Sequence, residues 1–228
     1  MVKKIRETDF DVRKLTDGTL YANKRILSDY RADNPDPVPL LYQTGYLTIV
    51  AYEPVGQVCT LAFPNGEVKY GFLESLAPAY MQGVSAGSGN NIFALRKHIE
   101  SANLEGVRDI LTALFASIPY TDTDKAPFEH YFQSVLFILF TLLGQMVKCE
   151  VHSAKGRADC IVETRDYVYI FEFKLDKSAE EALAQIEEKQ YALPYRADSR
   201  KLYKIGVSFD SASRGLTGWK ENGDCTPS

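Results

Sequence analysis

Two acidic residues and a lysine lie in two neighbouring, strongly apolar segments of the chain. The segment Tyr167-Val-Tyr-Ile-Phe-Glu-Phe-Lys174 contains Glu172 and Lys174, and Asp159 belongs to the preceding extended segment, Arg157 to Glu163. Side chains alternate between the faces of a strand, so Glu172 and Lys174 share one face and stand about 7 Å apart. Charged groups in apolar strands are costly unless they are paired or used, so this pattern favours a functional site.

A short hairpin between the two segments would bring Asp159 to Glu172. Either natural register, with Asp159 opposite Glu172 or opposite Ile170, leaves both carboxylates on one face of the sheet. Directly opposed side chains lie about 5 Å apart, which is close enough to share one cation and repulsive without it. The structural alternative is that Glu172 and Lys174 form a plain ion pair on an edge strand and that Asp159 is a carboxylate near a turn.

Two carboxylates on one face predict a magnesium site. Mg²⁺ prefers oxygen ligands, takes one or two carboxylates, and fills its other positions with water and substrate phosphate; Mn²⁺ can replace it. Such an ion neutralises charge on a phosphate and lowers the pKa of a bound water, which favours phosphodiester hydrolysis near neutral pH. Lys174, on the same face, would orient that water or stabilise the charge that develops on the phosphate.

Composition limits where and how such a site could act. Hydrophobic residues make up 45% of the chain and charged residues 25%, as in ordinary globular proteins, and no apolar run is long enough for a membrane helix. Without a signal peptide we expect a cytoplasmic protein. The cysteines and histidines lack zinc-ligand spacing, so we expect structural thiols with no disulfide. The net charge of −4 argues against indiscriminate nucleic-acid binding, so any contact must be local.

The elements that must position the acidic residues follow an α-β-β-β-α-β order. A long apolar helix from about Ala126 ends at Gly144, and helices are expected on both faces of the sheet. The later elements are expected at Val147 to Ser153, Arg157 to Glu163, Tyr167 to Lys174, the helix Ser178 to about Tyr191, and Leu202 to Phe209.

A separate small unit is expected in residues 1–81. Extended segments at Tyr46 to Tyr52 and Gln57 to Phe63 predict a hairpin, and Asn65 is expected to cap the helix that follows. This arrangement favours a winged-helix-like unit. Residues 82–125 are expected to be a linker with bridging helices. The glycine-rich stretch Gly83 to Asn91 lacks the Gly-Lys-Ser/Thr of a phosphate-binding loop and is expected to be a linker or loop.

These motifs resemble a known family. Asp159 followed by Glu172-Phe173-Lys174 on the next strand, in the αβββαβ order, is similar to the PD-(D/E)XK nuclease superfamily. A closer likeness is to the nuclease-like domain that follows an AAA-ATPase-like domain in a large bacterial family, and it spans nearly the whole chain from about Leu40. The phrases that carry this likeness are Leu40 to Thr48, Phe63 to Val68, Ile118 to Tyr120 and Tyr169 to Lys174.

The resemblance implies an α/β, restriction-endonuclease-like core with a mixed sheet in residues 126–228, preceded by a small α+β tail of the ATPase-like domain. The phosphate loop of that domain has no counterpart here, so nucleotide hydrolysis is not predicted. The implied catalytic residues are Glu129, the metal ligands Asp159 and Glu172, the lysine Lys174, and Gln185. The residues expected to contact nucleic acid are Lys155, Arg157, Tyr191 and Arg196.

Two functions remain open at this point. The first is a Mg²⁺-dependent nuclease acting on DNA, or less readily on RNA, through a metal-activated water. The second is a catalytically silent nuclease fold that docks to, or regulates, a partner ATPase. Retention of Glu129, Asp159, Glu172 and Lys174 together favours the enzyme, whereas the acidic net charge favours the docking module.

Overall fold

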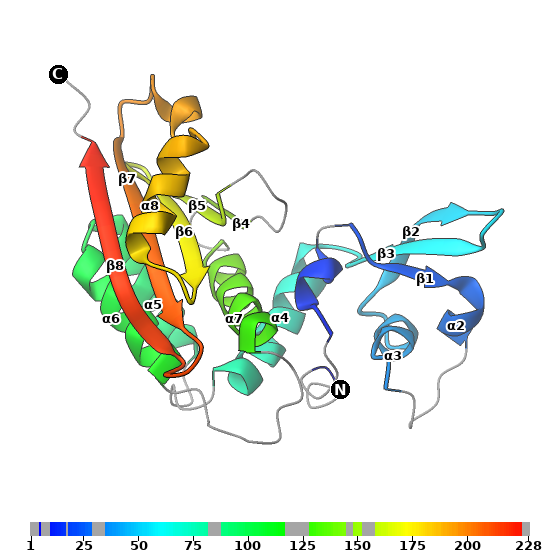
Figure 1. Cartoon of the computed structure of the whole chain (residues 1–228). Coiled ribbons are helices and arrows are strands. Elements are labelled where there is room, and N and C mark those ends of the chain that lie inside the picture. The colour runs from blue at the N-terminus through cyan, green and yellow to red at the C-terminus, as the bar shows by residue number, and fades with distance from the viewer. Residues whose placement is uncertain are drawn as a thin grey trace. The chain divides into compact units, whose positions relative to one another are not determined.

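The chain folds into two compact units, which are Met1–Tyr80 with Tyr120–Val135, and Met81–Pro119 with Leu136–Ser228 (Figure 1). The structure, a computed structural model, describes residues 5, 10–16, 18–28, 35–81, 88–116, 128–144, 148–151 and 158–224. No helix within these ranges is long and apolar enough to cross a membrane.

The first unit contains a three-stranded antiparallel sheet in the order β1-β3-β2. The expected hairpin is confirmed as β2 and β3, and Asn65 caps the next helix, since its Oδ1 accepts a hydrogen bond of 2.9 Å from the Val68 amide. The described elements of this unit are η1 (Val12–Leu15), β1 (Tyr21–Asn23), α2 (Lys24–Ser28), α3 (Val38–Gln43), β2 (Thr48–Glu53), β3 (Val58–Ala62) and α4 (Gly66–Tyr80).

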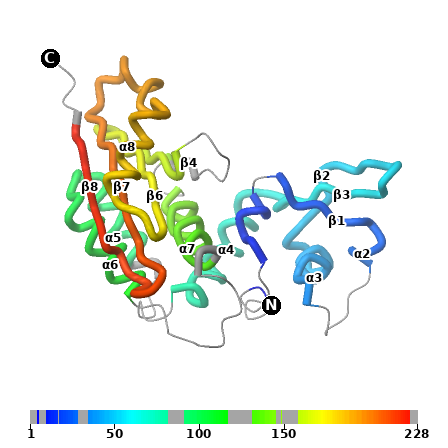
Figure 2. Tube along the Cα trace, viewed as in Figure 1, coloured from blue at the N-terminus to red at the C-terminus, as the bar shows by residue number. Residues whose placement is uncertain are grey.

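The second unit contains a five-stranded mixed sheet in the order β4-β5-β6-β7-β8. Figure 2 traces β6, β7 and β8 side by side. Strands β6 and β7 are parallel and the other neighbours are antiparallel, so the expected mixed sheet is confirmed. Its elements are α5 (Ser88–Glu100), α6 (Leu104–Ala116), α7 (Phe128–Leu143, which begins in the first unit), β4 (Lys148–Val151), β5 (Cys160–Glu163), β6 (Tyr167–Leu175), α8 (Ala179–Glu188), η2 (Leu193–Tyr195), β7 (Lys201–Asp210) and β8 (Gly215–Asp224).

One face of this sheet is aromatic and is covered by α5, α6 and α7. The ring of Phe140 in α7 lies 5.4 Å from that of Phe171, Phe115 of α6 packs on β7, and the buried Tyr169 hydroxyl donates to the Ile99 carbonyl of α5 at 2.6 Å. Helices α5 and α6 lie in the stretch that was expected to be a linker with bridging helices, and they pack in the core of the second unit. The glycine-rich stretch, expected to be a loop, is helical from Ser88.

The other face packs against α8, whose buried residues are Ala179, Ala182 and Ile186. A capping box fixes the start of α8, because Ser178 Oγ accepts from the Glu181 amide at 3.1 Å and Glu181 Oε2 accepts from the Ser178 amide at 2.9 Å. The helix ends at Glu188 and not near Tyr191, since Gln190 has a left-handed φ of 55°. The buried cluster on this face consists of Ala158, Val168, Ile170, Ile186, Tyr191 and Leu202.

Candidate metal and catalytic site

The register of β5 and β6 brings Asp159 to Glu172. Cys160 pairs with Phe171, so the next step in the same register places Asp159, just before β5, opposite Glu172. The Asp159 carboxylate is fixed there because its Oδ2 accepts a hydrogen bond of 2.9 Å from the Phe173 amide. The two carboxylates thus lie beside one another at the edge of the α8-covered face.

Glu172 is an almost completely buried carboxylate with one satisfied and one unsatisfied oxygen. The residue is 1% exposed. Its Oε1 accepts from Lys174 Nζ at 2.9 Å and from Gln185 Nε2 at 2.5 Å. Its Oε2 is buried without a hydrogen-bond partner. A buried polar atom without a partner is costly, so this oxygen points to a ligand that supplies positive charge.

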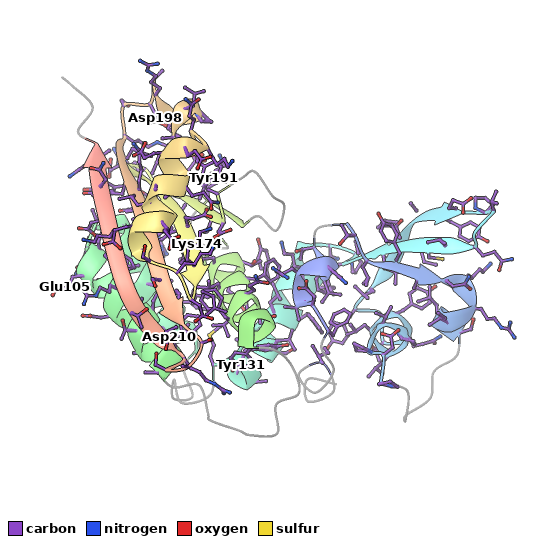
Figure 3. The ribbon with its side chains drawn as sticks, in the orientation of Figure 1. Glu105, Tyr131, Lys174, Tyr191, Asp198 and Asp210 are labelled. Atoms are coloured by element: carbon purple, nitrogen blue, oxygen red, sulfur yellow. The ribbon has the colours of Figure 1, made fainter. Side chains whose placement is uncertain are left out.

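Gln185 of α8 connects the lysine to the carboxylate. Its Oε1 accepts from Lys174 Nζ at 2.7 Å, while its Nε2 donates to Glu172 Oε1 and lies 3.4 Å from the Tyr191 hydroxyl. Figure 3 labels Lys174 on β6 and Tyr191 beyond α8. A primary amide carries both an acceptor and a donor, which is what the bridge between an ammonium and a carboxylate requires. Gln185 therefore fixes the position of Lys174 relative to Glu172.

The electrostatics of the site favour a bound cation. Burial, and then the neighbouring charge of Asp159, raise the pKa of Glu172, while its contact with Lys174 opposes that rise. One ammonium therefore does not compensate the two carboxylates fully. A divalent cation would restore the balance, because it favours the ionised form of both groups.

The donor set fits a hard divalent cation. Asp159 and Glu172, the latter through Oε2, are the residues that would hold it, and two carboxylates are the number that Mg²⁺ commonly takes. Within the described parts of the chain there is no group of three or more His, Cys, Asp or Glu side chains with metal-binding geometry, so a softer, all-protein site is not formed there.

This acidic pair lies within a segment that a family comparison recognises. Residues 127–219 match the family model of the PD-(D/E)XK nuclease superfamily. The PD-(D/E)XK segment runs from the start of α7 into β8 and includes each of the contacts described above. The match indicates a nuclease-type domain.

A curated relative extends the likeness beyond the PD-(D/E)XK segment. An uncharacterised protein from the vnfD 5′ region of Azotobacter chroococcum mcd 1 is 33% identical over 205 residues, or 87% of this chain. The chain spans only 40% of that relative's length. No solved structure matches the chain.

The other predicted site residues of the PD-(D/E)XK segment are either outside the described part of the structure or not in hydrogen-bond contact with Asp159 and Glu172 in it. Glu129 lies in the first turn of α7, but its side chain lies outside the described part of the structure, as do Lys155 and Arg157 entirely. Arg196 is exposed after η2. Tyr191, expected to contact nucleic acid, is only 8% exposed and belongs to the buried cluster, because the chain turns inward after α8 ends. Its hydroxyl lies 3.4 Å from Gln185 Nε2, and its contact with nucleic acid stays a prediction.

Two basic residues near Arg196, Arg200 and Lys204, are engaged in ion pairs. Arg200 Nη2 lies 2.6 Å from Asp198 Oδ2 and 2.8 Å from Glu163 Oε2. Lys204, which is buried, contacts Glu187 Oε1 at 2.9 Å. The charges of Arg200 and Lys204 are therefore compensated within the fold.

Glu172→Gln is expected to stabilise the cation-free protein at neutral pH. Folding raises the Glu172 pKa, so from about pH 4.3 up to the native pKa the folded state binds more protons than the unfolded state. The wild-type protein therefore loses stability as the pH rises through that window, whereas the glutamine variant does not. Thermal denaturation with a chelator measures the difference, and each 1 kcal/mol corresponds to about 2–4 °C.

The matched control is Glu163→Gln, which should lower the stability of the protein at neutral pH, whereas Glu172→Gln should raise it. Glu163 is partly buried, but its hydrogen bonds and ion pairs with Lys148 and Arg200 outweigh this burial and lower its pKa. The ionised Glu163 carboxylate therefore stabilises the folded protein above its unfolded-state pKa. This stabilisation is lost as the pH falls through the native pKa. Equal pH profiles for the wild-type protein and Glu172→Gln would show that Glu172 carries no such strain.

Proposed function

We propose that this chain is a divalent-cation-dependent nuclease that hydrolyses phosphodiester bonds in DNA. The observation that carries the proposal is the buried Glu172 oxygen without a partner, beside Asp159, in a segment that matches the PD-(D/E)XK family. Mg²⁺ is the cation that best suits two carboxylates, and Mn²⁺ can take its place. Nucleases of this family typically use divalent metals, which supports the same choice.

Each described side chain has a role in this proposal. Asp159 and Glu172 hold the cation, which when bound neutralises charge on the scissile phosphate and activates the attacking water. Lys174 has three N–H donors, and its contacts with Glu172 and Gln185 use two of them. In this proposal the third donates to a phosphate oxygen or to the attacking water, where a fixed positive charge stabilises the transition state.

A reducing compartment such as the cytoplasm is the proposed location of this activity. Cys59 is a free thiol and is buried in the first unit. Free buried thiols are characteristic of reducing compartments, where disulfides are rare. RNA is the second substrate to test, since the cation and the lysine contact only the phosphate.

A protein-docking role has its own supporting observation, in the first unit. Large apolar side chains are exposed on β1 and on the β2–β3 hairpin, and they include Tyr21, Val50, Tyr52 and Val55, the last at 96% exposure. Clusters of exposed apolar residues mark interaction surfaces. The proposed partner is the ATPase that the sequence resemblance implies, with the nuclease site either active or silent in that complex.

The deciding experiment is a cleavage assay of the purified chain on plasmid DNA, single-stranded DNA and RNA. We expect cleavage with Mg²⁺ or Mn²⁺ and none with chelator. Ca²⁺ should bind without supporting cleavage well, because its looser coordination polarises water less. If the protein binds no divalent cation at millimolar concentration and cuts none of the three substrates, the docking function replaces the nuclease.

A further inference from the structure

Gly206 lies directly beside Glu172, on the neighbouring parallel strand β7 and on the face that α8 covers. A Cβ atom at Gly206 would lie 2.3 Å from the Ala179 carbonyl oxygen and 2.7 Å from the Leu183 amide nitrogen, both in the backbone of α8. Contacts below 3.0 Å to backbone atoms are not tolerated. Any side chain at this position must therefore push α8 away from the sheet.

This displacement of α8 would be too large for the hydrogen bonds of Gln185 to persist. Moving the Ala179 oxygen from 2.3 Å to an ordinary contact of at least 3.4 Å requires a shift of about 1 Å. Gln185 lies on the same helix and contacts Glu172 at 2.5 Å and Lys174 at 2.7 Å. A shift of about 1 Å lengthens such contacts to the limit of a hydrogen bond.

Gly218 and Gly223 of β8 serve as comparisons for Gly206, because a side chain at these positions would displace α8 less or not at all. A Cβ at Gly218 would meet Ser208 Cβ at 3.1 Å and Ala179 Cβ at 3.2 Å, which asks for a smaller adjustment of α8. A Cβ at Gly223 would meet only side-chain atoms of β7, the nearest being the Tyr203 ring at 3.3 Å, and would leave α8 untouched.

We infer that Gly206 is a positioning residue of the candidate site: its lack of a side chain lets α8 approach β7 closely enough for Gln185 to hold Lys174 and Glu172. The catalytic meaning of this inference rests on the proposed function, whereas the packing does not. Gly206 acts on the site through α8 and contacts no substrate.

The side-chain amide of Gln185 reports this packing directly, without a cation or a substrate. In ¹⁵N-labelled full-length protein, its NH₂ resonances are identified by their loss in Gln185→Leu. They should show the slow solvent exchange of a hydrogen-bonded amide in the wild-type protein. In Gly206→Ala they should move to the position and fast exchange of a solvated glutamine, in Gly218→Ala they should move partway, and in Gly223→Ala they should stay unchanged.

A folded Gly206→Ala protein with wild-type Gln185 resonances would overturn the inference. If Gly206→Ala does not fold, Gly218→Ala decides, because it disturbs the same helix less. A shift in the direction of Gln185 release supports the inference, and wild-type resonances refute it.

A double-mutant comparison of cleavage rates then tests the link to catalysis. Gly206→Ala should lower kcat by about 10–100-fold, the usual cost of losing a residue that orients a metal site. In a Gln185→Leu background it should add little, since the contact it disturbs is already gone. Fully additive losses would contradict the inference. If the wild-type protein cuts nothing while the amide resonances behave as expected, the proposed function fails and the packing role of Gly206 stands.

Discussion

Asp159→Ala and Glu172→Ala are each expected to abolish divalent-cation binding and nucleic-acid cleavage together. The two carboxylates are the donors that the structure offers to a cation, and Glu172 Oε2 has no other partner. Losing one such preorganised group costs at least about 10²–10³-fold in rate. Calorimetric titration with Mg²⁺ and Mn²⁺ measures the binding, and a cleavage assay at saturating substrate measures the rate.

Glu163→Gln is the control for this prediction. Glu163 is an acidic residue of the adjacent strand β5 on the same face as Asp159, but it is paired with Lys148 and Arg200. Its variant should bind cations and cleave like the wild-type protein. Wild-type cation affinity in Glu172→Ala would refute the assignment of the buried carboxylate as a ligand.

Lys174→Ala is expected to separate cation binding from turnover. Lys174 donates to Glu172 Oε1, whereas the oxygen offered to the cation is Oε2, so the ligand remains in place when the lysine is removed. Turnover should fall by about 10²–10³-fold, because the developing charge on the phosphate loses a fixed donor. The titration should be made at mildly alkaline pH, since removal of the ammonium raises the Glu172 pKa further.

Lys204→Ala is the matched control for Lys174→Ala. Lys204 is also a lysine on the α8-covered face, on the adjacent parallel strand, but its partner is Glu187. Its removal should lower stability and leave turnover per folded molecule unchanged. If Lys174→Ala loses cation binding as completely as Glu172→Ala does, the lysine has a structural role. The proposed separation of cation binding from turnover is then wrong.

The parts of the site that follow from strand alternation could be predicted from the sequence. The segment of β6 has a strict two-residue period, so the shared face of Glu172 and Lys174 and the hairpin parity with Asp159 could be predicted from residue types alone. The αβββαβ order, predicted from the apolar patterns, and the mixed sheet, implied by the family resemblance, are both confirmed. The chemical roles of these residues stay predictions.

Other features depend on tertiary packing and have no local signature. The inward turn of Tyr191 follows from the left-handed backbone at Gln190, which no nearby glycine signals. The double contact of Gln185 depends on how closely α8 packs on the sheet, where Gly206 and Gly218 both face Ala179 of that helix. The start of helix α5 within the glycine-rich stretch was not expected, because its first residues, Ser88-Gly-Asn-Asn91, are poor helix formers.

Strand β8 was missed because Gly215-Leu-Thr-Gly-Trp-Lys-Glu-Asn-Gly-Asp224 is rich in glycine and charge and lacks an apolar alternation. In the sheet that the structure describes, β8 lies at the end of the strand order. An outer strand presents unpaired backbone groups that invite another chain to pair and aggregate. Exposed charges such as Lys220 and Glu221, and the irregular register near Phe209, make such pairing unfavourable. The composition that made β8 hard to predict from the sequence therefore also disfavours aggregation through this outer strand.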